Sequence, residues 1–495
     1  MNRRRFLRRA GAIAAALALP SPLRGDPYRP WRPESAGAAP VRIRGRVVAE
    51  GRGVARAAIS DGIEVVSTAA DGTFELVGDG AQPFVMLSPP AGYEIPVQPA
   101  GTFRLFQPIR PDPNGEMAVQ FGLTPLRRSD ERHAFLVLAD TQTQDPGEMA
   151  RLHAETVPDV QAMIRTLSDL PLFGVADGDI MYDDLSLYGE YERAVRRMGI
   201  PFAQVVGNHD LDLETASDEA SITTFQQHFG PAYYSFNRGR VHYVVLDDVF
   251  FYSGGYLGYL TDRQLRWLER DLALVEPGAP VVVFLHIPLH SQLYVRHDRP
   301  RPEISNTLTN REALLRLLEP FPARVISGHT HEMEHRQEGR VFEHTLGTVC
   351  GAWWTGDICY DGTPNGYAVF QVDGESFRWR YQGTGQPVGH QIRLYPPGAD
   401  PALPASVVAN IWSWDPEWTV TYSVNGQPRG TMTRRRGLDP WSVAQHAGEA
   451  KPARRTWIDP VRTEHLFYAE VPAGANVGVE AKDRWGETFH STMQL

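Results

Sequence analysis

Apolar and polar positions alternate in the first part of the chain. Residues 41–47 read Val-Arg-Ile-Arg-Gly-Arg-Val, and a second alternating stretch, residues 73–76, follows the turn pair Asp71-Gly72. A period of two between Asp-Gly turns is typical of antiparallel strands. We therefore expect a small antiparallel β-sandwich over residues 41–125.

Longer apolar runs replace this alternation between residues 130 and 390. They are rich in Val, Leu and Phe and occupy residues 135–138, 172–176, 202–206, 243–246, 281–285 and 324–326. Segments with helical spacing, such as residues 260–272, separate several of these runs. Uniformly apolar strands that alternate with helices are typical of buried sheets covered by helices. The pattern predicts an α/β domain over residues 130–390.

The pattern returns to β features in the last hundred residues. A Pro-rich break at residues 395–398 precedes the alternating stretch 418–424, which ends at the turn pair Asn425-Gly426. Such a stretch before Asn-Gly is a strong hairpin signal. We expect a β-rich C-terminal domain over residues 395–495.

The N-terminus has the layout of an export signal. Residues 1–25 contain an arginine-rich start, a short apolar run and a Pro/Ser break, and the start resembles the twin-arginine export motif. An ordinary secretory signal and a basic tail without structure are the alternatives. With residues 26–40 as a linker, the expected location is the periplasm or the exterior of a bacterial cell.

The overall charge limits the kinds of partner. The chain has 495 residues, with 49 Lys and Arg against 59 Asp and Glu, which gives a net charge of −10. Without residues 1–25, which carry six arginines and no acid, the charge becomes about −16. Nucleic-acid binding needs a concentrated positive face, and a membrane helix needs roughly 20 apolar residues. We therefore expect neither a nucleic-acid partner nor stable membrane insertion.

Cysteine is scarce in this sequence. Cys350 and Cys359 are the two cysteines, so a disulfide framework and a cysteine zinc site are excluded. In an oxidising compartment the two residues either form one disulfide or stay as buried thiols.

The hydrophobic content of the chain, 42% with 10% aromatic residues, is that of a globular protein.

Polar motifs follow the predicted strands of the central domain. They are Asp140-Thr141-Gln142, Gly178-Asp179, Gly207-Asn208-His209-Asp210, His286 and Gly328-His329-Thr330-His331. The carboxyl ends of parallel strands meet at one edge of a sheet, so these side chains are expected to lie together. Carboxylates, imidazoles and an amide suit Mn, Fe or Zn better than Ca, and a carboxylate can bridge two such ions.

As an ordered set, these motifs strongly resemble those of the calcineurin-like metallophosphoesterase superfamily. The resemblance covers residues 130–385 and implies an α/β/β/α sandwich. Residues 41–125 resemble prealbumin-like modules, and residues 351–367 and 407–412 resemble the exported bacterial subgroup with extra N- and C-terminal β domains.

The resemblance implies a centre of two metal ions and assigns roles by position. Its metal ligands are Asp140, Gln142, Asp179, Asn208, His286, His329 and His331. Asp179 bridges the two ions, and a hydroxide between them attacks phosphorus in line. His209 faces the leaving group as an acid or electrostatic stabiliser, and Asp210 orients it. Hydrolysis of a phosphate mono- or diester is the implied activity.

Two positions depart from the family pattern. Gln142 stands where the superfamily usually has the histidine of Asp-x-His, so it either ligates metal weakly through its carbonyl or holds a metal-bound water. Tyr182 follows Asp179 by three residues, the spacing at which purple acid phosphatases have a tyrosinate ligand. We expect Tyr182 to line the cleft without touching metal, which predicts a colourless enzyme.

Substrate contacts are expected close to the metal motifs. The candidates are Tyr182, Asp183, His290, Trp353 and Trp354. The expected substrate is a phosphorylated small molecule, glycan or lipid head group, and we expect a monomer. The competing hypotheses are a metal-dependent protein that binds such a group without turning it over, and an enzyme similar to the purple acid phosphatases that uses Tyr182.

Overall fold

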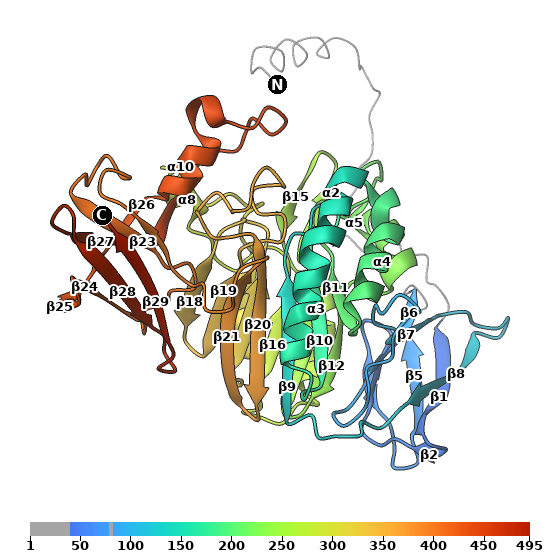
Figure 1. Ribbon diagram of the computed structural model, residues 1–495. Helices are drawn as coiled ribbons and strands as arrows, with labels where there is room; N and C mark the ends of the chain where they lie inside the picture. Colours follow the sequence, from blue (N-terminus) through green and yellow to red (C-terminus); the bar gives the residue numbers. More distant parts are fainter. Residues whose placement is uncertain (1–39, 79–82) are drawn as a thin grey trace, which may run out of the picture. The chain divides into compact units, whose positions relative to one another are not determined.

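The computed structural model describes residues 40–78 and 83–495 (Figure 1). The predicted signal peptide and all but the last residue of the predicted linker lie outside the described residues. Among the helices of the described residues, none is both long enough and apolar enough to cross a membrane.

The N-terminal region contains two small sheets. The first consists of β1 (Val41–Ala49), β2 (Arg52–Gly53), β5 (Thr73–Gly78) and β8 (Glu116–Leu123), and the second of β3 (Ala58–Ser60), β4 (Val65–Ser67), β6 (Phe84–Ser88) and β7 (Phe106–Pro108). Along β5 the burial alternates residue by residue, with Phe74 and Leu76 buried against Ile43 and Val47 of β1. The period of two in the sequence thus corresponds to one face packed inward and one facing solvent.

One strand pair in this region differs from the expected antiparallel arrangement. β1 and β8 run parallel, from Arg42 beside Glu116 to Ala49 beside Leu123, whereas the other pairs are antiparallel. The chain passes through the second sheet between β5 and β8, and such a crossover lets it return in the same direction.

Two larger sheets form the central region. The first has the order β11-β10-β9-β20-β21, with β9 (Arg132–Leu138), β10 (Leu172–Asp177), β11 (Phe202–Val205), β20 (Gly366–Asp373) and β21 (Ser376–Gly383). The second has the order β12-β13-β16-β17-β19-β18, with β12 (Tyr234–Arg238), β13 (Val241–Val245), β16 (Val281–Phe284), β17 (Ala323–Ser327), β18 (Glu334–Glu338) and β19 (Val341–Thr345). Strands β9, β10 and β11 are parallel to one another, as are β13, β16, β17 and β19.

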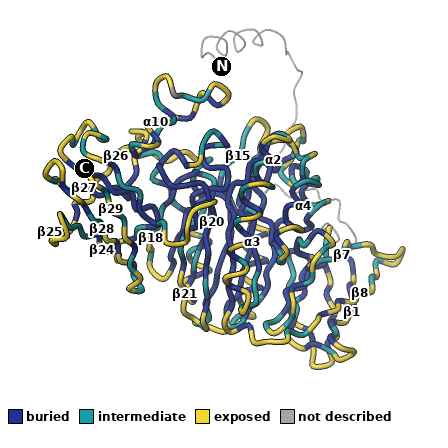
Figure 2. Tube along the Cα trace, viewed as in Figure 1, coloured by how far each residue is buried: buried dark blue, intermediate teal, exposed yellow. Residues whose placement is uncertain are grey.

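Alternate residues of each central strand enter different cores. In β9, Leu136 packs with the helices on the outer face, while Phe135 and Val137 pack with residues of the second sheet such as Phe284. In β16, Val283 faces the helices on the other side. Both faces of each sheet are therefore covered, and inner strands such as β9, β13 and β16 are buried along nearly their whole length, whereas β18 and β21 at the sheet edges are partly exposed (Figure 2).

Helices complete the outer layers. The first sheet is covered by α2 (Pro146–Arg151), α3 (Val157–Thr166) and α4 (Tyr188–Met198), and the second by α7 (Asp262–Leu272) and α9 (Arg311–Leu318). Figure 1 shows α3 lying across the face of β9 and β10. The expected α/β/β/α sandwich is confirmed. The short elements of this region are a π-helical turn (Leu152–Thr156), a 3-10 turn (Leu185–Leu187), α5 (Asp218–Ser221), α6 (Thr223–Phe229), α8 (Leu293–Arg296), β14 (Val249–Tyr252) and β15 (Gly255–Gly258).

The C-terminal region is rich in β structure, as expected. One sheet contains β22 (Arg393–Tyr395), β23 (Ser406–Asn410), β26 (Thr433–Leu438) and β27 (Arg462–Glu470), and the other β24 (Thr419–Val424), β25 (Gln427–Thr431), β28 (Asn476–Lys482) and β29 (Thr488–Gln494). Helix α10 (Pro440–His446) and a 3-10 turn (Gly448–Ala450) precede a segment that continues to β27.

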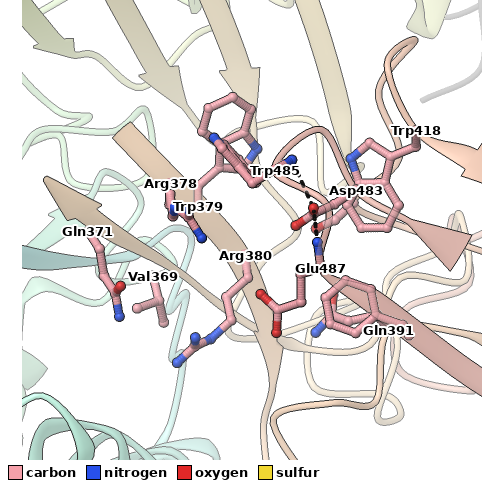
Figure 3. Close-up of a pocket in the computed structure, with 12 residues that line it drawn as sticks. Val369, Gln371, Arg378, Trp379, Arg380, Gln391, Trp418, Asp483, Trp485 and Glu487 are labelled. Atoms are coloured by element: carbon pink, nitrogen blue, oxygen red, sulfur yellow. Dashed lines mark hydrogen bonds between the residues drawn. The ribbon is translucent and has the colours of Figure 1, made fainter. Parts of the chain in front are cut away.

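A cavity of about 80 Å³ lies where β21 meets the C-terminal region. Figure 3 shows Trp379 and Arg380 of β21 beside Asp483, Trp485 and Glu487. None of the candidate site residues lines this cavity, so it is separate from the polar motifs.

Candidate metal centre

The polar motifs occupy the loops directly after the parallel strands. Asp140 follows β9, Asp179 follows β10, Asn208 follows β11, His286 follows β16 and His329 follows β17. The carboxyl ends of parallel strands share one edge of each sheet, which brings residues that are far apart in the sequence to one place.

Several of these residues have a left-handed backbone. The φ angle is 48° at Asp140, 48° at Asp179, 70° at His329 and 54° at His331. Residues other than Gly and Asn rarely adopt this backbone conformation, which costs of order 1–3 kcal/mol per residue. Backbone strain of this kind gathers at functional sites, and here it falls on the predicted ligands.

Three predicted ligands form one tight cluster. The ligand atoms of Asp179, His286 and His329 all lie within 4.8 Å of one another. His286 Nε2 is 3.3 Å from Asp179 Oδ1 and 3.2 Å from His329 Nδ1. One cation can therefore contact all three side chains.

Each of the three predicted histidine ligands is held from behind by a backbone carbonyl. His286 Nδ1 lies 3.1 Å from the oxygen of Asp177, His329 Nε2 lies 2.9 Å from that of Ser305, and His331 Nδ1 lies 2.8 Å from that of Gly351. A ring nitrogen that donates to a carbonyl carries the proton, so the other nitrogen keeps its lone pair for a metal ion.

The other half of the centre is built around Asp140. Its carboxylate accepts a hydrogen bond from the backbone of His329 at 2.9 Å and lies 3.4 Å from His331 Nε2. His331 Nε2 and Asn208 Oδ1 are buried and have no hydrogen-bond partner among the described residues. Buried polar atoms without partners are costly, and a bound metal ion would supply their missing partner.

The charges of the cluster also favour a bound cation. In the metal-free protein burial alone would lower the pKa of His286, but the Asp179 carboxylate raises it to about 10, so a proton on Nε2 takes the place that a bound metal ion would occupy. Burial raises the pKa of Asp179, and His286 together with His209 outweighs that effect and lowers it. The donor set, the lone pairs and the local charge fit two transition-metal ions of the Mn, Fe or Zn class.

Gln142 does not point its carbonyl at the cluster. Its Nε2 donates to Asp179 Oδ2 at 2.5 Å, and its Oε1 lies 3.8 Å from Cys350 Sγ. In this geometry Gln142 positions Asp179, and the expectation that its carbonyl ligates a metal is not met. The amide of Gln142 has N–H groups that can donate to a carboxylate. A histidine at this position would turn a lone pair toward the metal and would offer no such donor.

His209 lies beside the cluster and outside the ligand set. Its backbone N–H donates to Asp179 Oδ1 at 2.8 Å, and its Nδ1 lies 2.7 Å from Asp183 Oδ1. The imidazole stacks on the ring of Tyr182, with a centroid distance of 4.1 Å. Asp183, predicted as a substrate contact, thus orients His209.

Asp210 has a different role from the predicted one. Its carboxylate is fully buried and accepts hydrogen bonds from the backbone of Ile180, Met181 and Gly207, and from the hydroxyl of Tyr188. Because these four donors hold it, Asp210 fixes the loops that carry Asp179 and His209. The orienting partner of His209 is Asp183, so that part of the sequence prediction is wrong.

Tyr182 lies between His209 and an arginine from the C-terminal region. The guanidinium carbon of Arg455 is 4.9 Å from the centroid of the Tyr182 ring. Burial, followed by the nearby Asp183, raises the pKa of the Tyr182 hydroxyl. That Tyr182 lines the cleft without touching metal stays a prediction.

Two predicted substrate contacts, His290 and Trp354, have other partners. His290 pairs with Glu343 through Nδ1 and with Glu338 through Nε2, so both ring nitrogens are occupied. Trp354 is buried and donates its indole N–H to the carbonyl of Thr141. His290 and Trp354 are therefore structural, in contrast to their prediction.

Trp353 remains beside the centre. Its ring stacks on His331 at 4.0 Å between centroids and is half-buried. Cys350 and Cys359, in the same loop, are free buried thiols, and both contact the hydroxyl of Thr348 at 3.7 Å. Of the two cysteine alternatives, the structure has the unpaired thiols.

Sequence reasoning missed Arg455 and the carbonyl supports of the histidines. Arg455 lies far along the chain, in a segment with no motif of its own, and a carbonyl oxygen is present in every residue. Asp183 carried a signal, since a carboxylate four residues after Asp179 lies in the same loop.

Three family models match this chain. They are the calcineurin-like phosphoesterase model over residues 133–333, its N-terminal companion over residues 41–126 and its C-terminal companion over residues 343–489.

Individual relatives match parts of the chain. A serine/threonine-protein phosphatase CPPED1 of Mus musculus is 31% identical over 179 residues, which is 34% of this chain and 56% of that protein. Purple acid phosphatase 15 of Arabidopsis thaliana is 30% identical over 164 residues, 31% of this chain and 28% of that protein. The chain thus spans less than two thirds of either relative. A dimetal phosphatase structure from Danio rerio matches 51% of this chain and 96% of its own, with 16% identity and a TM-score of 0.36.

Proposed function

Because the chain belongs to the calcineurin-like phosphoesterase superfamily, we propose that it is a metal-dependent phosphoesterase that hydrolyses phosphate esters at the centre described above. The observation that carries the proposal is the set of three histidines whose outer nitrogens are bonded to carbonyls, with lone pairs turned toward Asp179 and Asp140. A histidine arranged in this way is prepared to bind metal.

The residues divide into two ligand groups. Asp179, Asn208, His286 and His329 would hold one ion, and Asp140, His331 and the shared Asp179 the other. When bound, such ions supply Lewis-acid activation of water and neutralise the charge on the phosphate. Asp210 and Gln142 hold Asp179 and its loop in position.

The reaction is an in-line displacement at phosphorus. Water attacks phosphorus, the bond from phosphorus to the leaving oxygen breaks, and that oxygen takes up a proton. His209 is placed to donate this proton, because it borders Asp179 and its Nδ1 is bonded to Asp183. A carboxylate behind an imidazole supports its protonated form, which is the form that an acid catalyst needs.

The finer parts of this proposal rest on the sequence. Export is indicated by the arginine-rich residues 1–25, and phosphorylated small molecules, glycans or lipid head groups are the substrate classes. The proposal covers both monoesters and diesters.

The test is hydrolysis of p-nitrophenyl phosphate and bis(p-nitrophenyl) phosphate by the purified protein, with Mn, Fe and Zn added in turn after chelation. We expect turnover that depends on added metal. Saturable phosphate binding without turnover under any of the three metals would instead support the binding protein.

A further inference from the structure

A turn of the C-terminal region lies against both sides of the metal centre. Arg455 and Trp457, two residues apart, are the side chains that make these contacts. Arg455 lies over Tyr182, which stacks on His209, and Trp457 meets Trp353 at 6.3 Å between ring centroids.

This turn is anchored and not a loose loop. The backbone N–H of Ile458 donates to the carbonyl of Arg455, and that of Val461 donates to the carbonyl of Tyr360. The side chains of Ile458 and Val461 are buried beside Ala352 and Tyr360, in the loop that also carries Trp353. The positions of Arg455 and Trp457 are therefore fixed by packing on the same loop that borders the centre.

The guanidinium of Arg455 is only partly used by the protein. Its Nη2 donates to Glu148 Oε1 at 2.6 Å and lies 3.4 Å from Gln144 Oε1. Arg455 is only 1% exposed. Its Nη1 is buried and yet has no hydrogen-bond partner among the described residues. A buried charged donor with an unbonded N–H is costly, so an anionic oxygen that reaches Arg455 Nη1 would form a strong charge-assisted hydrogen bond with it.

Arg454, the neighbouring residue, provides a contrast. Its guanidinium is more than half exposed and donates to Asp145, at 2.5 Å, and to Gln144. Arg454 thus attaches the turn to the start of α2 from outside, whereas Arg455 reaches inward to Tyr182.

We propose that Arg455 forms an anionic subsite on the leaving-group side of the centre, so that preferred substrates carry a second phosphate or carboxylate beyond the scissile phosphate. Stacking places Arg455, Tyr182 and His209 in a row, and His209 faces the leaving group in the proposed reaction. The indole of Trp457, 53% exposed, lies against Trp353 on the other side of the centre and is not part of this subsite. This inference rests on the proposed function.

The test compares phenyl phosphate with 4-carboxyphenyl phosphate and 1,4-phenylene bisphosphate. The wild-type protein should prefer one or both of the anion-bearing esters by about tenfold in kcat/KM. The preference should come from a lower KM, because a charge-assisted hydrogen bond strengthens binding by about this factor. The carboxylate and phosphate arms show which anion the subsite takes. No preference for either ester would overturn the proposal.

Three variants separate recognition from folding. Arg455→Gln should lose the preference, Arg455→Lys should retain part of it, and the matched control Arg454→Gln should keep it. Thermal melts report on folding of each variant. An equal loss toward all three esters in Arg455→Gln would instead assign Arg455 a structural role and overturn the proposal.

A binding measurement distinguishes this proposal from the proposed function. Phenylphosphonate and 4-carboxyphenylphosphonate resist hydrolysis, so calorimetry measures their affinity without turnover. Tighter binding of the carboxylated probe that is lost in Arg455→Gln supports the subsite even if no ester is hydrolysed. Equal affinity for both probes, in wild type that hydrolyses esters, contradicts the subsite and leaves the esterase intact.

Discussion

The Nδ1 nitrogen of His209 lies 2.7 Å from a carboxylate oxygen of Asp183, and both residues lie in loops that meet at Asp179. This pair combines an imidazole beside the reaction site with a carboxylate that is 40% exposed at its side chain. Asp183 is therefore a positioning residue that acts through His209, in the way a carboxylate commonly fixes the tautomer of a catalytic histidine.

The first prediction concerns His209. We expect His209→Ala to keep its metal content and to lose turnover by about 100- to 10,000-fold, the range for general acid catalysis. The loss should be larger for esters with poor leaving groups, because these need protonation most. Steady-state kinetics with p-nitrophenyl and alkyl phosphates measure it, and an equal loss for both leaving groups would contradict the role as acid.

Asp183→Asn serves as the intermediate variant in the same assay. The amide keeps a hydrogen bond to His209 but not the negative charge, so its loss of turnover should be smaller than that of His209→Ala. A loss equal to or greater than that of His209→Ala would show that Asp183 acts by more than positioning.

The second prediction concerns metal content. Asp179→Asn removes a charged ligand next to His286 and leaves the Gln142 amide facing another amide, so we expect loss of both ions. Metal analysis by mass spectrometry after desalting checks this, with Asp183→Asn as the matched control in the same loop region. Full metal content in Asp179→Asn would contradict the bridging role.

The third prediction concerns Tyr182. The ring stacks on His209, which lies outside the ligand set, so we expect an iron-loaded protein to show no tyrosinate-to-iron absorption. Visible spectra of the wild type and of Tyr182→Phe should be the same. A visible band in the wild type that disappears in Tyr182→Phe would assign Tyr182 as a ligand.

The fourth prediction concerns stability in acid. Burial lowers the pKa of His133 and that of His335 to about 4, from an ordinary value of 6.5. Their stabilising effect is complete above pH 6.5 and is lost as the pH falls toward 4, because the unfolded chain binds protons that the folded chain excludes. The free energy of unfolding should fall by about 1.4 kcal/mol per pH unit for each histidine.

Urea unfolding between pH 7 and pH 4.5 measures this slope. His133→Gln cannot titrate but can still bond with the Tyr243 hydroxyl, so its slope should be smaller than that of the wild type. His490→Gln, at an exposed position on β29, is the control and should keep the wild-type slope. An unchanged slope in His133→Gln would show that this histidine is not buried in its neutral form.

The local pattern of apolar and polar residues predicts the layered fold. It does not predict the parallel pairing of β1 and β8. Apolar runs such as that of β9 predict a strand buried on both faces, because each face enters a different core. The direction of β8 depends on the path of the chain through a second sheet, which no local pattern records. Alternating positions look the same in a parallel pair and in an antiparallel one.

The candidate site was predictable where a residue type that binds metal directly follows a predicted strand. Asp179 and His286 each follow an apolar strand, so residue type and topology point to the same edge. The role of Asp210 was not predictable, because the carboxylate next to His209 in sequence turns away to bind backbone N–H groups. The role of Arg455 was not predictable either, because its neighbours in space, among them Glu148 and Tyr182, are far from it in the sequence.

The carbonyl groups behind the three histidines have a consequence for mutational studies. The oxygens of Asp177, Ser305 and Gly351 fix the ring orientations, yet every amino acid at these positions would supply the same oxygen. Alanine substitution does not remove these oxygens, and at Gly351, which has a φ of 57°, an added Cβ would lie 2.7 Å from the carbonyl oxygen of Ile358 and strain the loop for a separate reason. Only a change in loop length, or replacement of the peptide bond by an ester, reaches this part of the centre.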